Sequence, residues 1–523
     1  MQASGAMTGR QLTNRRLVII AAMAGTFLSA LDTSIVGTVM PTIVGQLGGL
    51  SIYSWVFSAY LLTSTTTVPL YGRLSDMYGR KPLFIASACL FVLGSALCGV
   101  SQNMAQLVAF RAVQGLGAGG IVPVTFTILG DLFSVKERAK ISGLFSAVWG
   151  SSAVAGPTLG GFIVDYADWR WVFYINLPVG AASVYLMWRY LQETHESNER
   201  RIDYLGAALL TVSVSGLLLV LRQVGGGASW TAPSTLGLLV VVLALFSWFI
   251  IQEQRFSSPM MPLGLFRSRV IAVVSGAGVL IGGVMFGIST YIPLYVQGVS
   301  GRSAVQAGLT VAPFSIGWSA ASIVAGRVIL RAGYRVSVVT GVISAAIGSG
   351  CLLLLTPGRG VWPAAAGAGF VGIGMGLSAT AMLIAVQNAV GWSQRGVATA
   401  LVQFSRTIGG AVGVAALGTV LATGMAARLT SLDGPNKGSD ALLDTHVRAN
   451  LAPETLDRLR DALGRSLHQV YLGMFALALI AVAVVVLTFP RGSVSDLQGA
   501  DGGVGIGLER QPVGEAVDAV GSD

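Results

Sequence analysis

Charged residues are scarce in this chain. Asp, Glu, Lys and Arg together make up 11% of its 523 residues, against about 25% in an average soluble domain. Hydrophobic residues make up 53%, and the mean hydropathy is +0.71. A fold in water cannot hide so much apolar surface, because its exterior must be largely polar. The composition excludes an ordinary soluble protein and predicts one that is solvated by a lipid bilayer.

Cysteine and histidine are also rare. The chain holds three of each, namely Cys89, Cys98, Cys351, His195, His446 and His468. Cys89 and Cys98 would lie about 13 Å apart on one helix, which is too far for a disulfide. No spacing matches a set of metal ligands. We expect the cysteines to be core residues of apolar segments, and we expect neither a metal site nor a cofactor.

Enzyme signatures are missing from the sequence. There is no Gly-x-x-x-x-Gly-Lys-Ser/Thr loop, so the chain is not an ATP-driven pump by itself. A membrane-embedded enzyme would cluster His, Asp or Glu at one membrane face, and the sequence shows no such cluster. Glycine, by contrast, is abundant, with 69 residues, and within apolar runs small residues allow helices to pack closely. These features predict a membrane protein that is not an enzyme.

Long apolar runs fill most of the chain. A membrane span needs about 20 mostly apolar residues, and the first run begins near Leu17 and is too long for the core of a signal peptide. Fourteen runs are candidates: 17–40, 52–72, 83–101, 105–130, 141–164, 171–191, 204–224, 234–254, 270–297, 304–330, 336–356, 362–389, 396–424 and 467–490. We therefore expect an all-α integral membrane protein with fourteen transmembrane helices.

The net charge of +10 is explained by topology and gives no indication of nucleic-acid binding. If the N-terminus is placed inside the cell, alternate loops are rich in Lys and Arg, as at Arg80 and Lys81. The short loops on the other side hold only Arg170, Arg302 and Arg359. Cytoplasmic loops carry the excess of positive charge. We expect a multi-pass protein of the cell (inner) membrane with both termini in the cytoplasm.

An internal repeat divides the chain into two related halves. Gly72-Arg73-Leu74 with Gly79 recurs 254 residues later as Gly326-Arg327-Val328 with Gly333. At an offset of 257 residues the matching pairs are Gly115/Gly372, Gly117/Gly374, Gly119/Gly376, Arg138/Arg395, Gly156/Gly413 and Gly161/Gly418. Two repeated halves around a central binding site are typical of secondary transporters.

The repeat predicts the domain organisation. We expect a cytoplasmic N-terminus (1–16), an N-terminal six-helix bundle (17–191), two inserted spans (204–254), a C-terminal six-helix bundle (270–490) and a disordered cytoplasmic tail (491–523). The C-terminal bundle contains one long extracytoplasmic loop, 425–466, whose residues 453–467 have helical periodicity after a Pro-Glu start.

Three charged residues lie well inside predicted spans: Asp32, Arg111 and Arg406. Asp32 is the only acid well inside a span, and a carboxylate there costs several kcal/mol unless it is neutralised or paired. Because burial disfavours the charged form of a carboxyl group, Asp32 could take up and release a proton. Alternatively, it is a structural acid bonded to a neighbouring helix. Arg111 is a fixed cation, either coupled to that proton or packed against backbone partners, and Arg406 has Trp149 as its repeat mate.

Five motifs in order resemble those of a known family. They are Leu31-Asp32-Thr33-Ser34-Ile35-Val36, Gly72-Arg73-Leu74-Ser75-Asp76-Met77-Tyr78-Gly79-Arg80-Lys81, Arg111-Ala112-Val113-Gln114-Gly115-Leu116-Gly117, Gly156-Pro157-Thr158-Leu159-Gly160-Gly161 and Trp169-Arg170-Trp171-Val172-Phe173-Tyr174-Ile175-Asn176-Leu177-Pro178. Together they are similar to the signatures of the major facilitator superfamily, in its fourteen-span drug:proton antiporter branch. The resemblance covers about residues 15–425 and the last span, and implies two six-helix bundles plus two inserted spans.

The resemblance also implies roles for the motif residues. Asp32 and Arg111 would couple transport to protons. A conformational latch in the loop between spans 2 and 3 would consist of Gly72, Arg73, Asp76, Gly79 and Arg80. An antiporter hinge or leak seal would consist of Gly156, Pro157, Gly160 and Gly161. Plain positive-inside topology and a packing kink at the proline are the alternatives for the latch and the hinge.

The predicted function is a proton-coupled antiporter that exports lipophilic small molecules, as in multidrug efflux. Candidate residues of the substrate pocket are Phe27, Trp149, Tyr291, Trp318 and Arg406. One membrane acid cannot compensate two substrate charges, so we expect monocationic or neutral substrates. The alternatives are a dedicated exporter of one metabolite or lipid, and a non-transporting sensor or scaffold, which would not need two buried charges.

Overall fold

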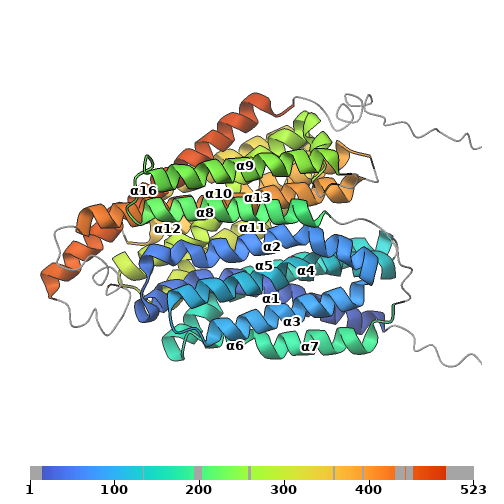
Figure 1. Cartoon of the computed structure of the whole chain (residues 1–523), viewed down its shortest axis with the longest axis horizontal. Coiled ribbons are helices and arrows are strands. Elements are labelled where there is room, and N and C mark those ends of the chain that lie inside the picture. Colours follow the sequence, from blue (N-terminus) through green and yellow to red (C-terminus); the bar gives the residue numbers. More distant parts are fainter. Residues whose placement is uncertain are drawn as a thin grey trace, which may run out of the picture.

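The computed structural model describes residues 14–133, 135–193, 203–256, 259, 261–356, 360–391, 394–429, 442 and 452–490. Within these ranges all regular structure is helical, and the long helices run side by side along the long axis of the molecule (Figure 1). The prediction of an all-α protein is confirmed.

The chain order is simple. The first half contains α1 (Arg15–Leu47), the 3₁₀ turn η1 (Leu50–Ile52), α2 (Tyr53–Tyr78), α3 (Arg80–Gly99), α4 (Met104–Leu132), α5 (Val135–Tyr166), α6 (Trp171–Tyr174) and α7 (Asn176–Tyr190). A pair follows, α8 (Tyr204–Gly225) and α9 (Pro233–Arg255). The second half contains η2 (Leu263–Arg267), α10 (Arg269–Leu294), the π-helical turn η3 (Tyr295–Val299), α11 (Ala304–Leu352), α12 (Trp362–Asn388), α13 (Arg395–Leu429) and α16 (Pro453–Thr488).

Eleven helices of the described residues are long and apolar enough to cross a membrane. One of them, α11, has 49 residues and is interrupted at Gly333, where φ is 81°. The predicted spans 304–330 and 336–356 lie on either side of this break. The helices α2 and α5 are not among the eleven, since α2 is rich in Ser and Thr and α5 is rich in Ser and Gly. Both nevertheless pack against the other helices, α2 on α4 and α5 on α1.

The sequence repeat is also a repeat of backbone geometry and packing. Gly79 and its mate Gly333 both lie in the left-handed region, with φ values of 93° and 81°, where other residues are strained. The glycines of α4 and α12 make close contacts with repeat-equivalent backbone atoms: Gly115 with Tyr60 and Gly372 with Phe314, Gly117 with Phe91 and Gly374 with Ala345, and Gly119 with Ser64 and Gly376 with Trp318. Each contact partner in the second half is 254 residues beyond its counterpart, so the two halves are copies of one packing scheme.

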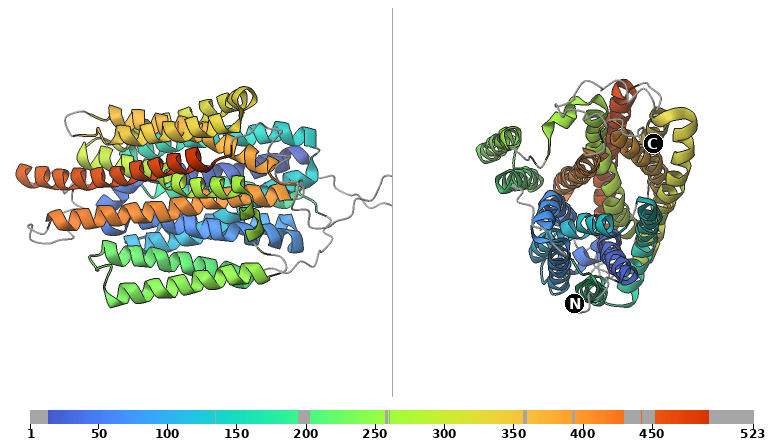
Figure 2. Two further views of the ribbon diagram at one scale, coloured as in Figure 1. Left: turned by 90° about the horizontal axis from the view of Figure 1, so that it is seen from above. Right: turned by 90° about the vertical axis from the view of Figure 1, so that its right-hand side faces the viewer.

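The pair α8–α9 lies beside the two halves. In the view along the long axis it stands apart from the other helices (Figure 2). Helix α8 packs on α13 and α2, and α9 packs mainly on α8. Asp203 holds the pair together at one end, because its carboxylate accepts hydrogen bonds from the backbone N–H of Gly206 and from the side chain of Gln252 on α9. Many apolar side chains of α9 are exposed, including Val240 and Trp248, as expected for a face that contacts lipid.

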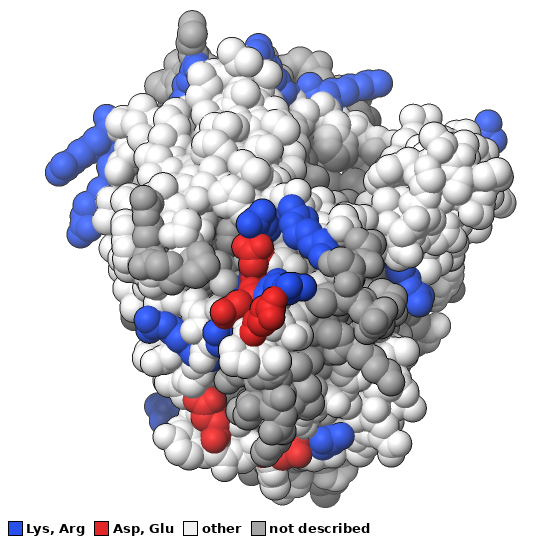
Figure 3. Space-filling view, turned by 90° about the vertical axis from the view of Figure 1, so that its left-hand side faces the viewer, with Lys and Arg blue, Asp and Glu red and all other residues white. Residues whose placement is uncertain are grey.

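Three expectations need correction. The segment 425–466 is not one loop: residues up to Leu429 belong to α13, and those from Pro453 belong to α16, which continues without a break to Thr488. The first turns of α16 carry two exposed ion pairs, Arg458–Glu454 and Arg465–Asp461, typical of a helix in water. Figure 3 shows the face at this end, where acidic and basic side chains lie close together near the middle of a largely uncharged surface.

The other two corrections concern a cysteine and a loop. Cys89 is exposed, whereas Cys98 is buried as expected. The latch motif does not form a loop, because α2 continues to Tyr78 and Gly79 alone separates it from α3. The predicted tail 491–523 lies outside the described residues.

Candidate functional site

The two predicted coupling residues form an ion pair inside the first half. Asp32 lies in the middle of α1, and Arg111 lies on α4, which packs against α1. The Arg111 Nη1 atom is 2.5 Å from the Asp32 Oδ2 atom, and the two side chains are 1% and 0% exposed, respectively. In so apolar a setting each charge requires the other, because an unpaired charge there is far more costly than a paired one.

Further polar groups complete the coordination of this pair. Gln114, one turn after Arg111, accepts a hydrogen bond from the Arg111 Nη1 atom at 2.8 Å and donates one to the Asp32 Oδ1 atom at 2.8 Å. The Asn176 amide, at the start of α7, lies 3.4 Å from the same carboxylate oxygen and donates to Ser95 at 3.0 Å. The guanidinium also lies over the ring of Tyr60, with its central carbon 4.1 Å from the ring centroid.

Hydrogen-bond donors surround the Asp32 carboxylate. Arg111, Gln114 and Asn176 each direct a donor at the carboxylate. When Asp32 is protonated, its new O–H needs an acceptor, and the Asn176 Oδ1 atom is buried without a partner among the described residues. A turn of that amide would present this oxygen to the acid. Protonation of Asp32 would remove the counter-charge of Arg111 and would weaken the link between α1 and α4.

The latch motif lies at the junction of α2 and α3. Gly79 has the positive φ that this sharp turn requires, and a Cβ there would lie 2.8 Å from a carboxylate oxygen of Glu193. Gly72 makes no comparable contact: among the described residues, no atom lies within 4 Å of a Cβ built there. Arg73 and Asp76 lie in the last turns of α2, and their side chains lie outside the described part.

The partner of this junction is Glu193, which follows α7. Its carboxylate accepts hydrogen bonds from the backbone N–H groups of Arg80 at 2.8 Å and Lys81 at 2.9 Å, and its oxygen is 3.7 Å from the Arg80 guanidinium. A carboxylate at the first turn of a helix satisfies free N–H donors and favours the positive end of the helix dipole. Glu193 therefore fixes the end of α7 to the start of α3.

The predicted hinge motif lies where α5 meets two other helices. Gly156 and Gly160 face Ser34 and Ile35 of α1, and Ser34 donates a hydrogen bond to the Ser152 carbonyl at 3.0 Å. The Pro157 carbonyl and Gly161 instead face the start of α11 in the other half, where they meet Gly308 and Val305. Helix α5 continues through Pro157 without a break. These positions allow close packing within the first half and between the halves.

The two halves are joined at one end of the molecule. We name its ends the Arg15 end and the Leu47 end, after the ends of α1. Hydrogen bonds between the halves in the described residues lie from the middle of the bundle towards the Leu47 end: Ser58 to the Ala411 carbonyl, Tyr53 to the Thr290 carbonyl, Thr42 to Gln297, Gln297 to the Thr38 carbonyl, and the backbone of Ala304 and Val305 to Asp165. The structure is thus closed at the Leu47 end.

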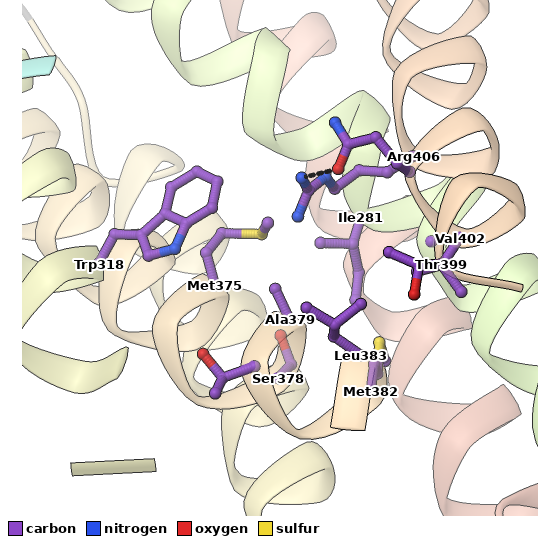
Figure 4. Close-up of a pocket in the computed structure, with 13 residues that line it drawn as sticks. Ile281, Trp318, Met375, Ser378, Ala379, Met382, Leu383, Thr399, Val402 and Arg406 are labelled. Atoms are coloured by element: carbon purple, nitrogen blue, oxygen red, sulfur yellow. Dashed lines mark hydrogen bonds between the residues drawn. The ribbon is translucent and has the colours of Figure 1, made fainter. Parts of the chain in front are cut away.

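A cavity of about 250 Å³ lies in the second half, between α10, α11, α12 and α13 (Figure 4). It contains two of the five predicted pocket residues, Trp318 and Arg406. The Arg406 guanidinium lies over the Trp318 ring, 5.6 Å from its centroid, and donates to the side chain of Gln403. Most other lining side chains are apolar, among them Ile281, Met375, Met382, Leu383 and Val402. The arrangement suits a lipophilic compound held by a few polar contacts.

Two of the other pocket candidates, Tyr291 and Phe27, are not among the residues that line this cavity. Tyr291 is fully buried, donates to the Val414 carbonyl at 2.6 Å and packs on Tyr53. Phe27 is half-buried on α1, and the side chain of Trp149 on α5 lies outside the described part.

Sequence reasoning did not assign roles to Gln114, Asn176 or Glu193. Gln114 and Asn176 stand inside motifs that were singled out, so their polar character within apolar runs was an available signal. Glu193 had no such signal, because its contact with the α2–α3 junction arises only when α7 packs against α3.

A two-half helical membrane protein with a buried ion pair in one half and a cavity in the other has the features of a transporter. The chain matches the family model "Major Facilitator Superfamily" over residues 22–414. The chain belongs to the Major Facilitator Superfamily, whose members are transporters and not enzymes.

Individual relatives agree with this family. The chain is 38% identical over 413 residues to the multidrug transporter protein MdtP of Bacillus subtilis, covering 79% of this chain and 76% of that one. It is 34% identical over 498 residues to multidrug resistance protein 3 of the same organism, covering 92% and 96%. Its fold is similar to that of a bacterial homologue of the human lysosomal transporter Spinster, with a TM-score of 0.64, 14% identity and coverage of 92% and 98%. The chain is thus a membrane transporter related to multidrug efflux pumps.

Proposed function

We propose that the chain is a proton-coupled antiporter that exports lipophilic small molecules across the cell membrane. Relatives named as multidrug transporters support the export of such compounds. The observation that carries the proposal is the fully buried ion pair of Asp32 and Arg111. A passive carrier has no need for a carboxylate in the membrane, whereas an antiporter needs one group that alternates between two protonation states.

The geometry of that pair supports a scheme for coupling. With Asp32 ionised, the pair and Gln114 tie α1 to α4. Protonation from the outside would release this tie and favour rearrangement of the first half, after which the proton would leave to the cytoplasm. Because substrate and proton would use opposite phases of one cycle, the proton gradient would drive substrate outwards.

The proposal includes the membrane topology. If α11 crosses the membrane twice around Gly333, and α2 and α5 each cross once, the chain has fourteen spans and both termini on the same side. Lys and Arg are then concentrated at the Arg15 end, which would face the cytoplasm. The structure would be inward-facing, since it is closed at the opposite, Leu47 end.

The test is transport by inverted membrane vesicles that contain the chain and no ATP. A proton gradient generated by respiration should drive uptake of a neutral lipophilic dye, and an uncoupler should abolish that uptake because it removes the only driving force. Vesicles without the chain supply the background. Dye uptake that persists after uncoupling, or that requires ATP, would contradict the proposal.

A further inference from the structure

The cavity in the second half holds a positive charge that no acid of the described residues neutralises. Arg406 lines it, yet none of the lining residues is Asp or Glu. Among the ion pairs of the described residues, Arg406 does not appear, and its side-chain partner is the neutral Gln403. In the first half Arg111 is instead paired with Asp32. The two intramembrane arginines therefore differ, since only Arg406 has its charge available to a ligand.

The aromatic face in this cavity is already occupied. The Arg406 guanidinium lies over Trp318, so a cationic substrate would have to displace it from the ring and would also be repelled by its charge. Such a cation would find no carboxylate among the lining residues to compensate it. These contacts favour a different substrate charge from the one expected from the lone membrane acid, Asp32.

We propose that this cavity binds compact lipophilic anions, that is, aromatic or aliphatic bodies with one carboxylate, sulfonate or phosphate. This inference rests on the proposed export function and specifies its substrate class. A guanidinium has five N–H donors in a planar fork. After its bond to Gln403, Arg406 retains donors for an anion, and such charge-assisted pairs are among the stronger hydrogen bonds. The two methionines in the cavity, Met375 and Met382, can adapt to different apolar bodies.

The size of the cavity favours a solute over a membrane lipid. About 250 Å³ lies slightly below the usual range for drug-sized pockets and holds one small ring system with its anionic group. Anionic lipids share the headgroup chemistry, so the experiment must distinguish the two sources.

The test is calorimetric binding of 2-naphthalenesulfonate and the uncharged 2-naphthalenesulfonamide to the full chain in phosphatidylcholine nanodiscs. The wild type should bind the sulfonate about tenfold or more tightly, as expected for one added charge-assisted contact. Arg406→Gln should remove this preference by weakening the sulfonate alone, and Arg406→Lys should keep part of it. Retained sulfonamide binding shows that each variant is folded. Arg331→Gln, which removes an exposed arginine of α11 outside the cavity, is the matched control and should keep the preference.

Two results would overturn the inference. One is equal affinity of the wild type for both compounds, and the other is an Arg406→Gln variant that keeps the sulfonate preference. If nanodiscs with phosphatidylglycerol suppress sulfonate binding tenfold or more, the site takes a lipid headgroup and the assignment to a soluble anion is wrong. Failure of the proposed export function gives a different result. In that case the gradient does not drive transport of the neutral dye, while the wild type still prefers the sulfonate.

Discussion

Replacing Asp32 with Asn is expected to abolish accumulation against a gradient. An amide keeps the shape of the side chain but cannot bind and release a proton. For each proton exchanged, a gradient of one pH unit supplies about 1.4 kcal/mol, enough for about tenfold accumulation of a neutral substrate. Proteoliposomes with the wild type should reach at least that ratio, and those with Asp32→Asn should only equilibrate the dye. A variant that still accumulates dye tenfold would show that the proton is carried elsewhere.

The same substitution leaves Arg111 buried without its counter-charge. Removing one partner of a buried ion pair costs about 3–5 kcal/mol, so the single variant should also unfold more easily. The matched control is the double variant Asp32→Asn with Arg111→Gln, which removes both charges. It should recover much of the thermal stability in detergent while remaining uncoupled. Loss of coupling in a variant of restored stability separates the proton role of Asp32 from a purely structural one.

Replacing Gly161 with Leu is expected to disfavour closure at the Leu47 end. A Cβ at Gly161 would lie 2.5 Å from the Val305 Cα atom and 2.6 Å from its backbone nitrogen. Backbone cannot move aside like a flexible side chain, so α5 and α11 must separate. Overpacking of this kind costs about 1–3 kcal/mol, which shifts a two-state equilibrium about 5- to 150-fold away from the closed form and should slow transport accordingly.

The readout is the reactivity of a single cysteine at the closed end. The native cysteines are first replaced by Ser. Gln297 is 8% exposed, so the cysteine introduced by Gln297→Cys should react slowly with a maleimide in detergent. Adding Gly161→Leu should increase that rate. The control is Gly276→Leu on α10, where no described atom lies within 4 Å of the added Cβ. Equal labelling rates in the two variants would contradict a packing role for Gly161 between the halves.

The helical fold and its repeat could be predicted from sequence because both depend on local patterns of apolar residues and glycines. Apolar runs defined most helices within a few residues, and the repeated glycines at 79 and 333 proved to be turns of the same geometry. The helical periodicity of 453–467 predicted the start of α16 at Pro453. Hydropathy did not predict that this charged segment and the last span form one continuous helix.

The candidate site was only partly predictable for a similar reason. Asp32 and Arg111 were identified because a charge in an apolar run needs a partner, and the structure does pair them. Glu193 sits among other polar residues after α7, so its contact with Arg80 and Lys81 depends on tertiary packing alone. Arg406 was a pocket candidate from sequence, and it does line the cavity, whereas the pairing of Asp32 with Arg111 leaves that acid outside it.

The most direct test of the central claim, exchange of substrate for protons, is a measurement of the reverse coupling. Proteoliposomes with the purified chain, no ATP and equal pH on both sides are given an outward gradient of a neutral lipophilic substrate, and a trapped dye reports the internal pH. The account predicts that substrate leaving the lumen draws protons in, so the lumen acidifies with the wild type and not with Asp32→Asn. A lumen of constant pH, while the wild-type chain carries labelled substrate across the membrane, would contradict it.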